Sequence, residues 1–326
     1  MRARARGRLH QALSGGLAIL ALALLIGCSD GTQVPLLDLG KPASPQEIRA
    51  ASHRPATAQP IYRFGFDLRN APQEDARQYQ PLLDYLQRTT GLAFQLRFSD
   101  SADRLITELQ EGQLAFAAIG AGSYLSIQPS GRLVPLVHGI NAQGEAGYRA
   151  ILVVAPNSPL QQVQELRGRR LAFGSRHSTQ GYWIPRIMLA RAGLELRDLG
   201  AYFFTGSHQA CAEAVITGQA DACGLQDTLA RQLIASGRLH QLAASDLYPS
   251  SGIFAQTELP ARIRQQVRQA LLAFDPQGRD RDGLYHWDDT EMAGGFAPAK
   301  TDDYRPLADW AERLKLLNPG GGEPCD

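Results

Sequence analysis

Short apolar segments that lead through small polar turns into helical patterns are the feature that most constrains the fold of this chain. The clearest case joins an apolar strand at Leu171–Phe173, a polar turn at 174–181 and a helical pattern at Trp183–Leu194. The same order occurs where the apolar run Leu114–Ile119 reaches the turn Gly120–Tyr124. Strands that alternate with helices predict an α/β fold of mostly parallel sheets with helices on both faces. Ligands of such sheets bind outside the carboxyl ends of the strands, so these turns are the candidate site.

The turn that follows Leu171–Phe173 has the chemistry of an oxyanion site. The first N–H groups of a helix have no partner within the helix, and the helix dipole is positive there. Ser178 and Thr179 add hydroxyl donors, and Gly181 lets the backbone approach a ligand closely. The turn is therefore predicted to hold a small oxyanion without a dedicated cation. The alternative is that Ser178 or Thr179 only caps the helix, as these residue types commonly do.

The rest of the chain continues the alternation of strands and helices. Apolar alternation and continuous apolar runs predict strands at Ile61–Phe66, Phe94–Phe98, Ala150–Ala155, Ala201–Phe204, Ala220–Leu225 and Ser250–Gln256. Apolar residues at helical spacing predict helices at Tyr79–Thr90, from Asp100 or Ser101 to Gly112, at Gln209–Thr217, from Leu259 through Leu272, and at Tyr304–Leu316. A polar loop is expected at Asp67–Glu74. A short echo between residues 111–115 and 217–221, each a helix end followed by Gly, Gln and a buried strand, suggests two lobes of similar build.

The first 27 residues indicate a processing signal. Four arginines among the first eight residues precede a short apolar segment, Leu17–Ile26, which leads into Gly27-Cys28. This segment is too short to favour a permanent membrane span. Its end resembles the lipobox of bacterial lipoproteins, which implies removal of residues 1–27 and lipidation of Cys28 as a membrane anchor. An ordinary cleaved signal peptide is the alternative. Ser29, rather than Asp, at the next position favours delivery to the outer membrane.

Composition limits the architecture and the partners. Residues 28–60 are rich in Pro, Ala, Ser, Gln and Gly and predict a flexible tether. The 326-residue chain is long enough for two cores. Its 33 basic residues balance its 32 acidic residues, so no net field favours nucleic acid. An exported chain meets an oxidising compartment. Cys211, in a helix, and Cys223, in the strand that follows it, are the predicted disulfide, and Cys325 is left over.

The order of these turns resembles the phosphate, phosphite and phosphonate substrate-binding proteins of ABC importers. The resemblance covers about Ile61 to Phe274. The matching pieces are Tyr79–Leu82 with Tyr85-Leu86, Gly112–Leu114, Gly120–Tyr124, Tyr148-Arg149, Leu166–Arg170, Phe173-Gly174, Ser178-Thr179, Gly181-Tyr182, Pro185-Arg186 and Phe204–His208. The resemblance implies a two-lobed type II periplasmic-binding fold with a hinge that the chain crosses twice. Residues 61–149 with 250–326 would form one lobe, and residues 150–249 the other.

The resemblance also implies a set of ligand-binding residues in the cleft between the lobes. Ser178, Thr179 and Gly181 match the turn that binds the phosphorus oxyanion, and His208 matches the cleft histidine of the family. Gln180 replaces the third serine of that turn and is expected to donate through its longer amide. Tyr124 and Tyr148 fit cleft positions, with half-buried packing as their alternative. Asp227 lies where the family places residues that sort amino-phosphonates, with a surface carboxylate as its alternative.

The function implied is capture of a small oxyanion and its delivery to the permease and ATPase of an ABC importer. The protein would be a lipid-anchored periplasmic monomer. A sensory module that reports ligand to a membrane signalling partner is the alternative, because one fold serves both uses. Beyond the match Gly27–Gly31, which lies at the predicted processing site, the chain has no Gly-x-Ser-x-Gly elbow. It also has no phosphate loop, no third glycine for a dinucleotide site and no metal-ligand spacing among its seven His. We therefore expect no enzyme, cofactor or metal. Phosphate, phosphite, an alkylphosphonate and other oxyanions all suit the turn.

Overall fold

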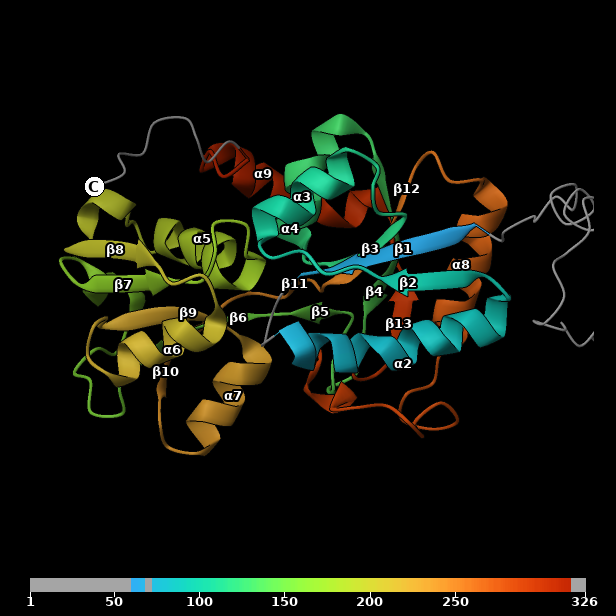
Figure 1. Ribbon diagram of the computed structural model, residues 1–326. Coiled ribbons are helices and arrows are strands. Elements are labelled where there is room, and N and C mark those ends of the chain that lie inside the picture. The colour runs from blue at the N-terminus through green and yellow to red at the C-terminus, as the bar shows by residue number, and fades with distance from the viewer. Residues whose placement is uncertain (1–59, 68–71, 318–326) are drawn as a thin grey trace, which may run out of the picture. The chain divides into compact units, whose positions relative to one another are not determined.

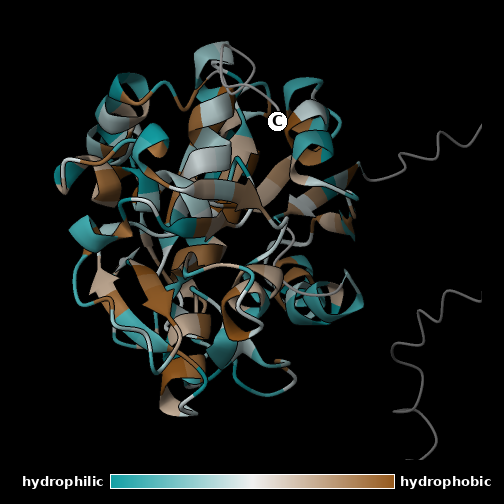
Figure 2. Ribbon diagram, turned by 90° about the vertical axis from the view of Figure 1, so that its left-hand side faces the viewer, coloured by the Kyte–Doolittle hydropathy of each residue, from teal (hydrophilic) through white to brown (hydrophobic). Residues whose placement is uncertain are grey.

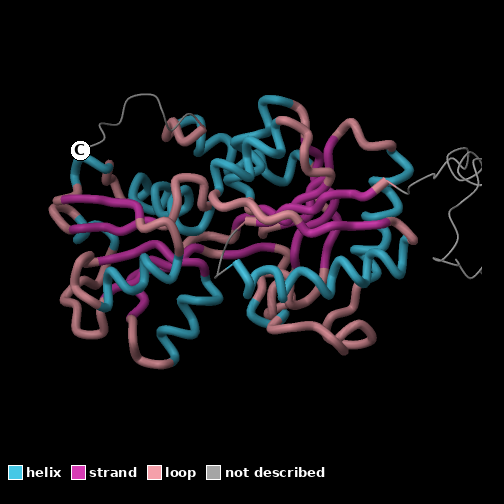
Figure 3. Tube along the Cα trace, viewed as in Figure 1, coloured by secondary structure: helices cyan, strands magenta, loops and turns pink. Residues whose placement is uncertain are grey.

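Two sheets, each lying between layers of helices, make up the folded part of the chain (Figures 1 and 3). The structure, a computed structural model, describes residues 60–67 and 72–317. The predicted signal segment, Cys28, nearly all of the tether and Cys325 lie outside these residues, so the expectations for them stay predictions. Within the described residues, no helix combines the length and apolar character that crossing a membrane requires.

The first sheet has six strands in the order β13-β4-β12-β3-β1-β2. Its strands are β1 (Ile61–Phe66), β2 (Ala93–Leu96), β3 (Phe116–Ile119), β4 (Leu133–Gly139), β12 (Gly252–Gln256) and β13 (Phe296–Pro298). The helices of this part are α2 (Pro72–Thr90), α3 (Ala102–Gln110), α4 (Ala121–Ile127), α8 (Ala261–Ala273) and α9 (Arg305–Arg313). Apolar side chains of α2 and α8 join one core, and those of α3, α4 and α9 join another. We call this sheet with these helices the first lobe.

The second sheet has five strands in the order β10-β6-β9-β7-β8. Its strands are β6 (Ala150–Val154), β7 (Arg170–Phe173), β8 (Ala201–Phe204), β9 (Ala222–Gln226) and β10 (His240–Ala244). Helix α5 (Ile184–Arg191) packs in one core, while α6 (His208–Ile216) and part of α7 (Asp227–Ala235) pack in another. We call this sheet with these helices the second lobe.

Continuous apolar strands occur because both faces of each sheet are covered. In β3, Phe116 and Ala118 belong to the core beneath α2 and α8, whereas Ala117 and Ile119 belong to the opposite core. Since successive side chains of a strand point to opposite faces, such a strand must be apolar at every position. Figure 2 shows brown, apolar strands between helices on which apolar and polar residues alternate.

Two crossovers connect the lobes and pair with each other. Residues 140–149 lead from β4 to β6, and residues 245–251 lead from β10 to β12. Within them, β5 (Gly147–Tyr148) and β11 (Tyr248–Pro249) form an antiparallel two-stranded ribbon. We call this ribbon with its flanking residues the hinge segments. The lobe boundaries at 149/150 and 249/250 stay a prediction.

The prediction of an α/β fold with two helix-flanked, mostly parallel sheets is confirmed, and a minority of strands in each sheet run against the others. β12 lies antiparallel between β3 and β4, and β6 is antiparallel to both β9 and β10. The reason is topological. Strands β4 and β10 run into the hinge segments, whereas β6 and β12 emerge from them and therefore run against their neighbours in the sheets.

Several element boundaries differ from those expected. Helix α2 begins at Pro72, so the last three residues of the predicted loop Asp67–Glu74 are helical. The predicted helix Trp183–Leu194 begins as a π-helical turn at Thr179–Trp183 and continues as α5. The structure joins Cys211 of α6 and Cys223 of β9 in a disulfide with a Cα–Cα distance of 5.9 Å, the pairing expected from the sequence.

Candidate ligand-binding cleft

A cleft of about 410 Å³ lies where the carboxyl ends of strands from both lobes face each other. Most of the lining residues follow the end of a strand, as expected for an α/β fold. The first lobe contributes Asp67 after β1, Asp100–Asp103 after β2 and Gly120 with Ser123 after β3. The second lobe contributes Gly174–Gln180 after β7, Gly206–His208 after β8 and Gln226 at the end of β9. Tyr148 of the hinge segments, Ser251 and Glu291 complete the lining.

The polar turn after β7 leads into the start of a helix, and we call residues 178–181 the anion turn after the role predicted for them. Ser178 is the N-cap of the π-helical turn, and its Oγ accepts the Gly181 N–H at 2.9 Å. The N–H groups of Thr179 and Gln180, at the start of this turn, have no carbonyl one turn earlier in the helix to bind. A Cβ at Gly181 would lie 2.8 Å from Ser178 Oγ and 3.0 Å from His208 Cε1, so a larger residue would displace one of these two side chains.

His208 lies beside the anion turn, and its surroundings define its tautomer. The backbone N–H of Gln226 donates to His208 Nδ1 at 3.3 Å, so the proton of the neutral ring is on Nε2. Nε2 lies 3.4 Å from Ser178 Oγ. A protonated Nε2 cannot accept the Ser178 hydroxyl hydrogen, which leaves that hydrogen for an acceptor in the cleft. His208 Nε2–H instead donates to Ser178 Oγ and orients the Ser178 hydroxyl, which presents one O–H donor to the cleft.

Thr179 connects the two lobes across the cleft. Its Oγ1 accepts the backbone N–H of Gly122, at the start of α4, at 2.7 Å in a buried position. A Cβ at Gly122 would lie 2.5 Å from the carbonyl oxygen of His177, which shows how closely the two turns approach. A second bond across the cleft joins His177 Nε2 and Asp103 Oδ1 at 2.7 Å. The structure therefore represents a closed arrangement of the lobes.

The expected ligand role of Gln180 does not agree with where its side chain points. Gln180 borders the cleft, but its Nε2 donates to the carbonyl oxygen of Arg149 at 3.0 Å and to Asp227 Oδ1 at 3.3 Å. Both amide hydrogens are engaged within the protein. The sequence offered no signal for this contact, because Gln180 and Asp227 are 47 residues apart.

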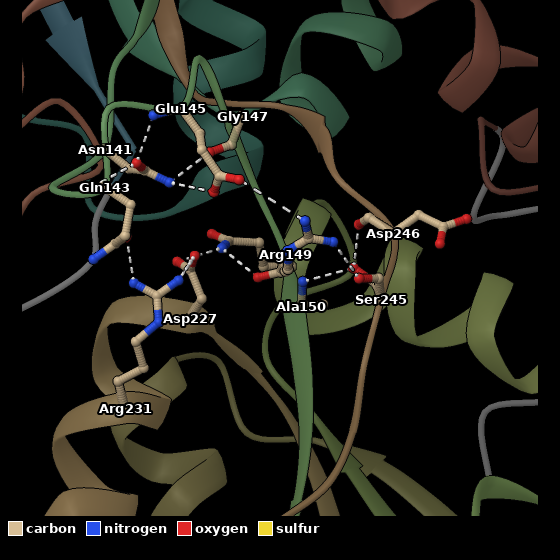
Figure 4. Close-up of polar contacts among 11 residues, drawn as sticks. Asn141, Gln143, Glu145, Gly147, Arg149, Ala150, Asp227, Arg231, Ser245 and Asp246 are labelled. Carbon is tan, nitrogen blue, oxygen red and sulfur yellow. Dashed lines mark hydrogen bonds and ion pairs between the residues drawn. The ribbon is translucent and has the colours of Figure 1, made fainter.

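Asp227 is not among the residues that line the cleft, contrary to the expectation from the resemblance. It is the first residue of α7, only 1% exposed, and its Oδ2 accepts from Arg231 Nη2 at 2.8 Å (Figure 4). Burial raises the pKa of the Asp227 carboxyl, and the neighbouring Glu291 adds to this effect, while Arg231 opposes it. The alternative of a surface carboxylate is also wrong, because the group is buried.

The two candidate tyrosines have different places. Tyr148 lines the cleft from the hinge segments. Tyr124 is 1% exposed in the core of the first lobe, where its ring stacks on Phe254 with centroids 4.6 Å apart and lies 4.8 Å from that of Tyr304. Burial raises the pKa of its hydroxyl, against the lowering effect of a hydrogen bond with Thr301. For Tyr124 the packing alternative is the one that the structure supports.

The charged groups of the cleft are distributed unequally between the lobes. The cation Arg176 and the imidazoles of His177 and His208 lie on the second-lobe side, and the lining carboxylates Asp67, Asp100, Asp103 and Glu291 all lie on the first-lobe side. Asp67 accepts the Gly120 N–H at 2.7 Å and the Ser123 hydroxyl at 3.1 Å. No group of three or more His, Cys, Asp or Glu side chains with the arrangement of a metal site occurs among residues 60–67 and 72–317.

Arg176, a cation that lines the cleft, was not among the site residues predicted from the sequence. Arg176 packs over the Phe204 ring, with its guanidinium carbon 4.2 Å from the centroid. Its carbonyl oxygen accepts from Trp183 Nε1 at 2.9 Å, which fixes the loop before the anion turn. The glycine-rich turn at 120–124 was the sequence signal for the first-lobe side of the cleft. Its hydrogen bond to the anion turn comes from Gly122 and not from Tyr124.

Comparison with known proteins agrees with this architecture. PhnD1 from Prochlorococcus marinus MIT 9301, solved in complex with methylphosphonate, superposes with a TM-score of 0.70 at 17% identity, over 78% of this chain and 98% of that one. A binding-protein component of an ABC phosphonate transporter from Pseudomonas aeruginosa gives a TM-score of 0.66 at 17% identity, over 80% and 95%. The alkanesulfonate-binding protein SsuA from Xanthomonas axonopodis pv. citri, bound to MOPS, gives 0.57 at 19%, over 79% and 94%. At these identities the similarity establishes the type II periplasmic-binding fold.

The sequence itself matches a family model over residues 64–304, which spans both lobes. That model describes the periplasmic substrate-binding proteins of phosphonate ABC transporters. The chain belongs to this family of periplasmic phosphonate-binding proteins of ABC transporters.

Proposed function

We propose that this protein captures a small phosphonate-type oxyanion in the cleft and delivers it to an ABC importer. The observation that carries the proposal is a set of donors at one place: the Ser178 hydroxyl, which His208 Nε2–H orients, and the backbone N–H groups at the start of the anion turn. Preformed donors at the positive end of a helix replace the hydration shell of an anion at little ordering cost. No reaction step is assigned to these groups.

The carboxylates on the first-lobe side support a narrower proposal about the ligand. An anion that filled the whole cleft would lie against Asp67, Asp100 or Glu291. Like charges repel strongly where water is excluded. We therefore propose that the oxyanion end faces the anion turn and that the opposite end of the ligand carries hydrogen-bond donors or a positive charge.

Calorimetric titration of the purified protein tests the proposal. The panel consists of methylphosphonate, 2-aminoethylphosphonate, phosphite, phosphate and methanesulfonate. We expect saturable 1:1 binding of at least one phosphonate, with phosphate bound more weakly. Absence of binding by every anion of the panel would refute oxyanion capture, and tightest binding of phosphate would refute the proposed role of the carboxylates.

The membrane anchor and the importer complete the proposal. A protein lipidated at Cys28 would hold its cleft near the permease, and residues 28–60 would give it reach. The importer role is tested by uptake: deletion of the gene should abolish growth on the bound phosphonate as phosphorus source, and a normal growth rate would contradict it.

A further inference from the structure

The side chain of Gln180 reaches out of the anion turn to the first hinge segment. Its Nε2 donates to the carbonyl oxygen of Arg149, the residue directly before β6. Gln180 is 4% exposed, and the second amide hydrogen reaches Asp227 Oδ1. One buried side chain thus connects the anion turn both to a hinge residue and to the start of α7.

Asp227 continues this connection to the other end of the hinge segment. Its second carboxylate oxygen accepts from Arg231 Nη2, and Arg231 Nη1 donates to Gln143 Oε1 at 2.6 Å (Figure 4). Gln143 lies in the loop directly after β4, and its backbone N–H donates to Asn141 Oδ1 at 2.9 Å. The chain of contacts therefore begins in the second lobe at the anion turn and ends in the loop that leaves the first lobe.

The second hinge segment is joined to the same group of residues. Arg149 Nη1 donates to the Ser245 carbonyl oxygen at 3.0 Å, and Ser245 Oγ accepts the Ala150 N–H at 3.0 Å (Figure 4). Asn141 Nδ2 donates to the Gly147 carbonyl oxygen at 3.0 Å. Both crossovers are consequently held in one hydrogen-bonded unit that includes the residue accepting from Gln180.

We propose that Gln180, Asp227, Arg231 and Gln143 form a positioning relay that couples the anion turn to the hinge and thereby sets the ligand affinity of the cleft. The inference rests on the proposed function, because it concerns how the same site holds its anion. Gln180 acts through the hinge and not as a ligand donor. The buried Asp227 carboxylate serves as the branching point, because it accepts from Gln180 with one oxygen and from Arg231 with the other.

The physical consequence is preorganisation of the closed arrangement. A turn that is bound to the hinge keeps its N–H and O–H donors in position, so less order must be created on binding. If the relay is broken at any point, a smaller fraction of the protein is binding-competent, and the apparent dissociation constant rises by the same factor. Residues of the relay that do not touch the cleft should therefore change ligand affinity, and their effects should not add.

The test measures the methylphosphonate affinity and the association and dissociation rates of the purified protein, of four single variants and of one double variant. Gln180→Met keeps the length of the side chain and removes both donors, and we expect about a three- to tenfold weaker affinity for loss of neutral hydrogen bonds. Gln143 is exposed and lies outside the cleft lining, and Gln143→Ala should weaken affinity roughly two- to fivefold. Gln143→Glu keeps an acceptor for Arg231 and should restore wild-type affinity. Gln277→Ala, an exposed glutamine in the loop after α8, is the matched control and should have no effect.

The double variant Gln180→Met with Gln143→Ala provides the decisive comparison. For one relay we expect its affinity to equal that of Gln180→Met alone, with a slower association rate, because fewer molecules are binding-competent, and an unchanged dissociation rate. Wild-type affinity in Gln180→Met or in Gln143→Ala, or strictly multiplicative effects in the double variant, would overturn the inference. A wild-type protein that binds neither methylphosphonate nor any other anion of the panel would instead refute the proposed function, and the inference with it.

Discussion

Gly122 gives the sharpest prediction about closure of the cleft. It lies near the start of α4 in the first lobe, where a Cβ would be 2.5 Å from the carbonyl oxygen of His177 and 3.1 Å from Thr179 Oγ1, both in the second lobe. A backbone oxygen cannot rotate away as a flexible side-chain end could. Gly122→Ala should therefore be compatible with α4 and incompatible with the closed arrangement.

Gly122→Ala should have opposite effects on the stability of the free protein and on ligand binding. Alanine is more favourable than glycine within a helix by about 1 kcal/mol, so the free protein should unfold at an equal or higher temperature. In the variant, the lobes could close only if the added methyl group held the backbone N–H of residue 122 away from Thr179 Oγ1, which would leave a buried donor without its partner at a cost of about 1–3 kcal/mol. That corresponds to roughly 5- to 150-fold weaker ligand binding.

Calorimetry and thermal unfolding of the same preparation measure both quantities. Ser126→Ala, in the same helix but outside the cleft lining, is the control, and its affinity should equal that of the wild type. Wild-type affinity of Gly122→Ala would refute the closed contact between Gly122 and the anion turn. A loss of stability together with affinity would show that the substitution disturbs the helix and not the closure.

Three further predictions concern other parts of the chain. Glu108 is 1% exposed; although burial opposes it, hydrogen bonds from Ser99, Arg104 and Arg97 lower the pKa of its carboxyl below the ordinary 4.5. Its contribution to stability is therefore present above pH 4.5 and lost as the pH falls through the folded value, so Glu108→Gln should flatten the acid side of the unfolding profile, and an identical profile would contradict this. Reduction of the disulfide, which joins residues 12 apart, should lower the unfolding free energy by about 2–3 kcal/mol, seen as a lower melting temperature, and alkylation of both thiols without reductant would contradict the bond. Mass spectrometry of the membrane fraction should find an acylated Cys28, and a soluble mature protein that begins elsewhere would exclude the anchor.

Much of the fold could be predicted because its signals are local. The apolar runs of β1, β3, β6 and β7 and the amphipathic pattern of α2 lie within single elements, and each element formed near its expected place. The position of the anion turn after β7 was also local information, since it depends on a strand end, small polar residues and a following helix.

The remaining features depend on contacts between distant residues. Strand β4 was not predicted: Pro135 argues against a strand, yet it lies next to a register shift in the pairing with β12, where a proline is tolerated. The antiparallel direction of β12 depends on a return from the other lobe. The bond from Gly122 to Thr179 spans 57 residues, and neither its existence nor the turning of Gln180 away from the cleft has a signature in the local sequence.

The claim that the anion turn binds the ligand is tested most directly by a titration of three proteins with methylphosphonate: the wild type, Thr179→Val and Thr179→Ser. Valine preserves the shape of threonine but provides neither the donor for an anion nor the acceptor for Gly122, whereas serine preserves both. We expect Thr179→Val to bind roughly ten- to a hundredfold more weakly, as for loss of one bond to a charged group, and Thr179→Ser to bind like the wild type. Equal affinity of all three proteins, each shown to be folded by its melting temperature, would contradict the assignment and place the ligand elsewhere.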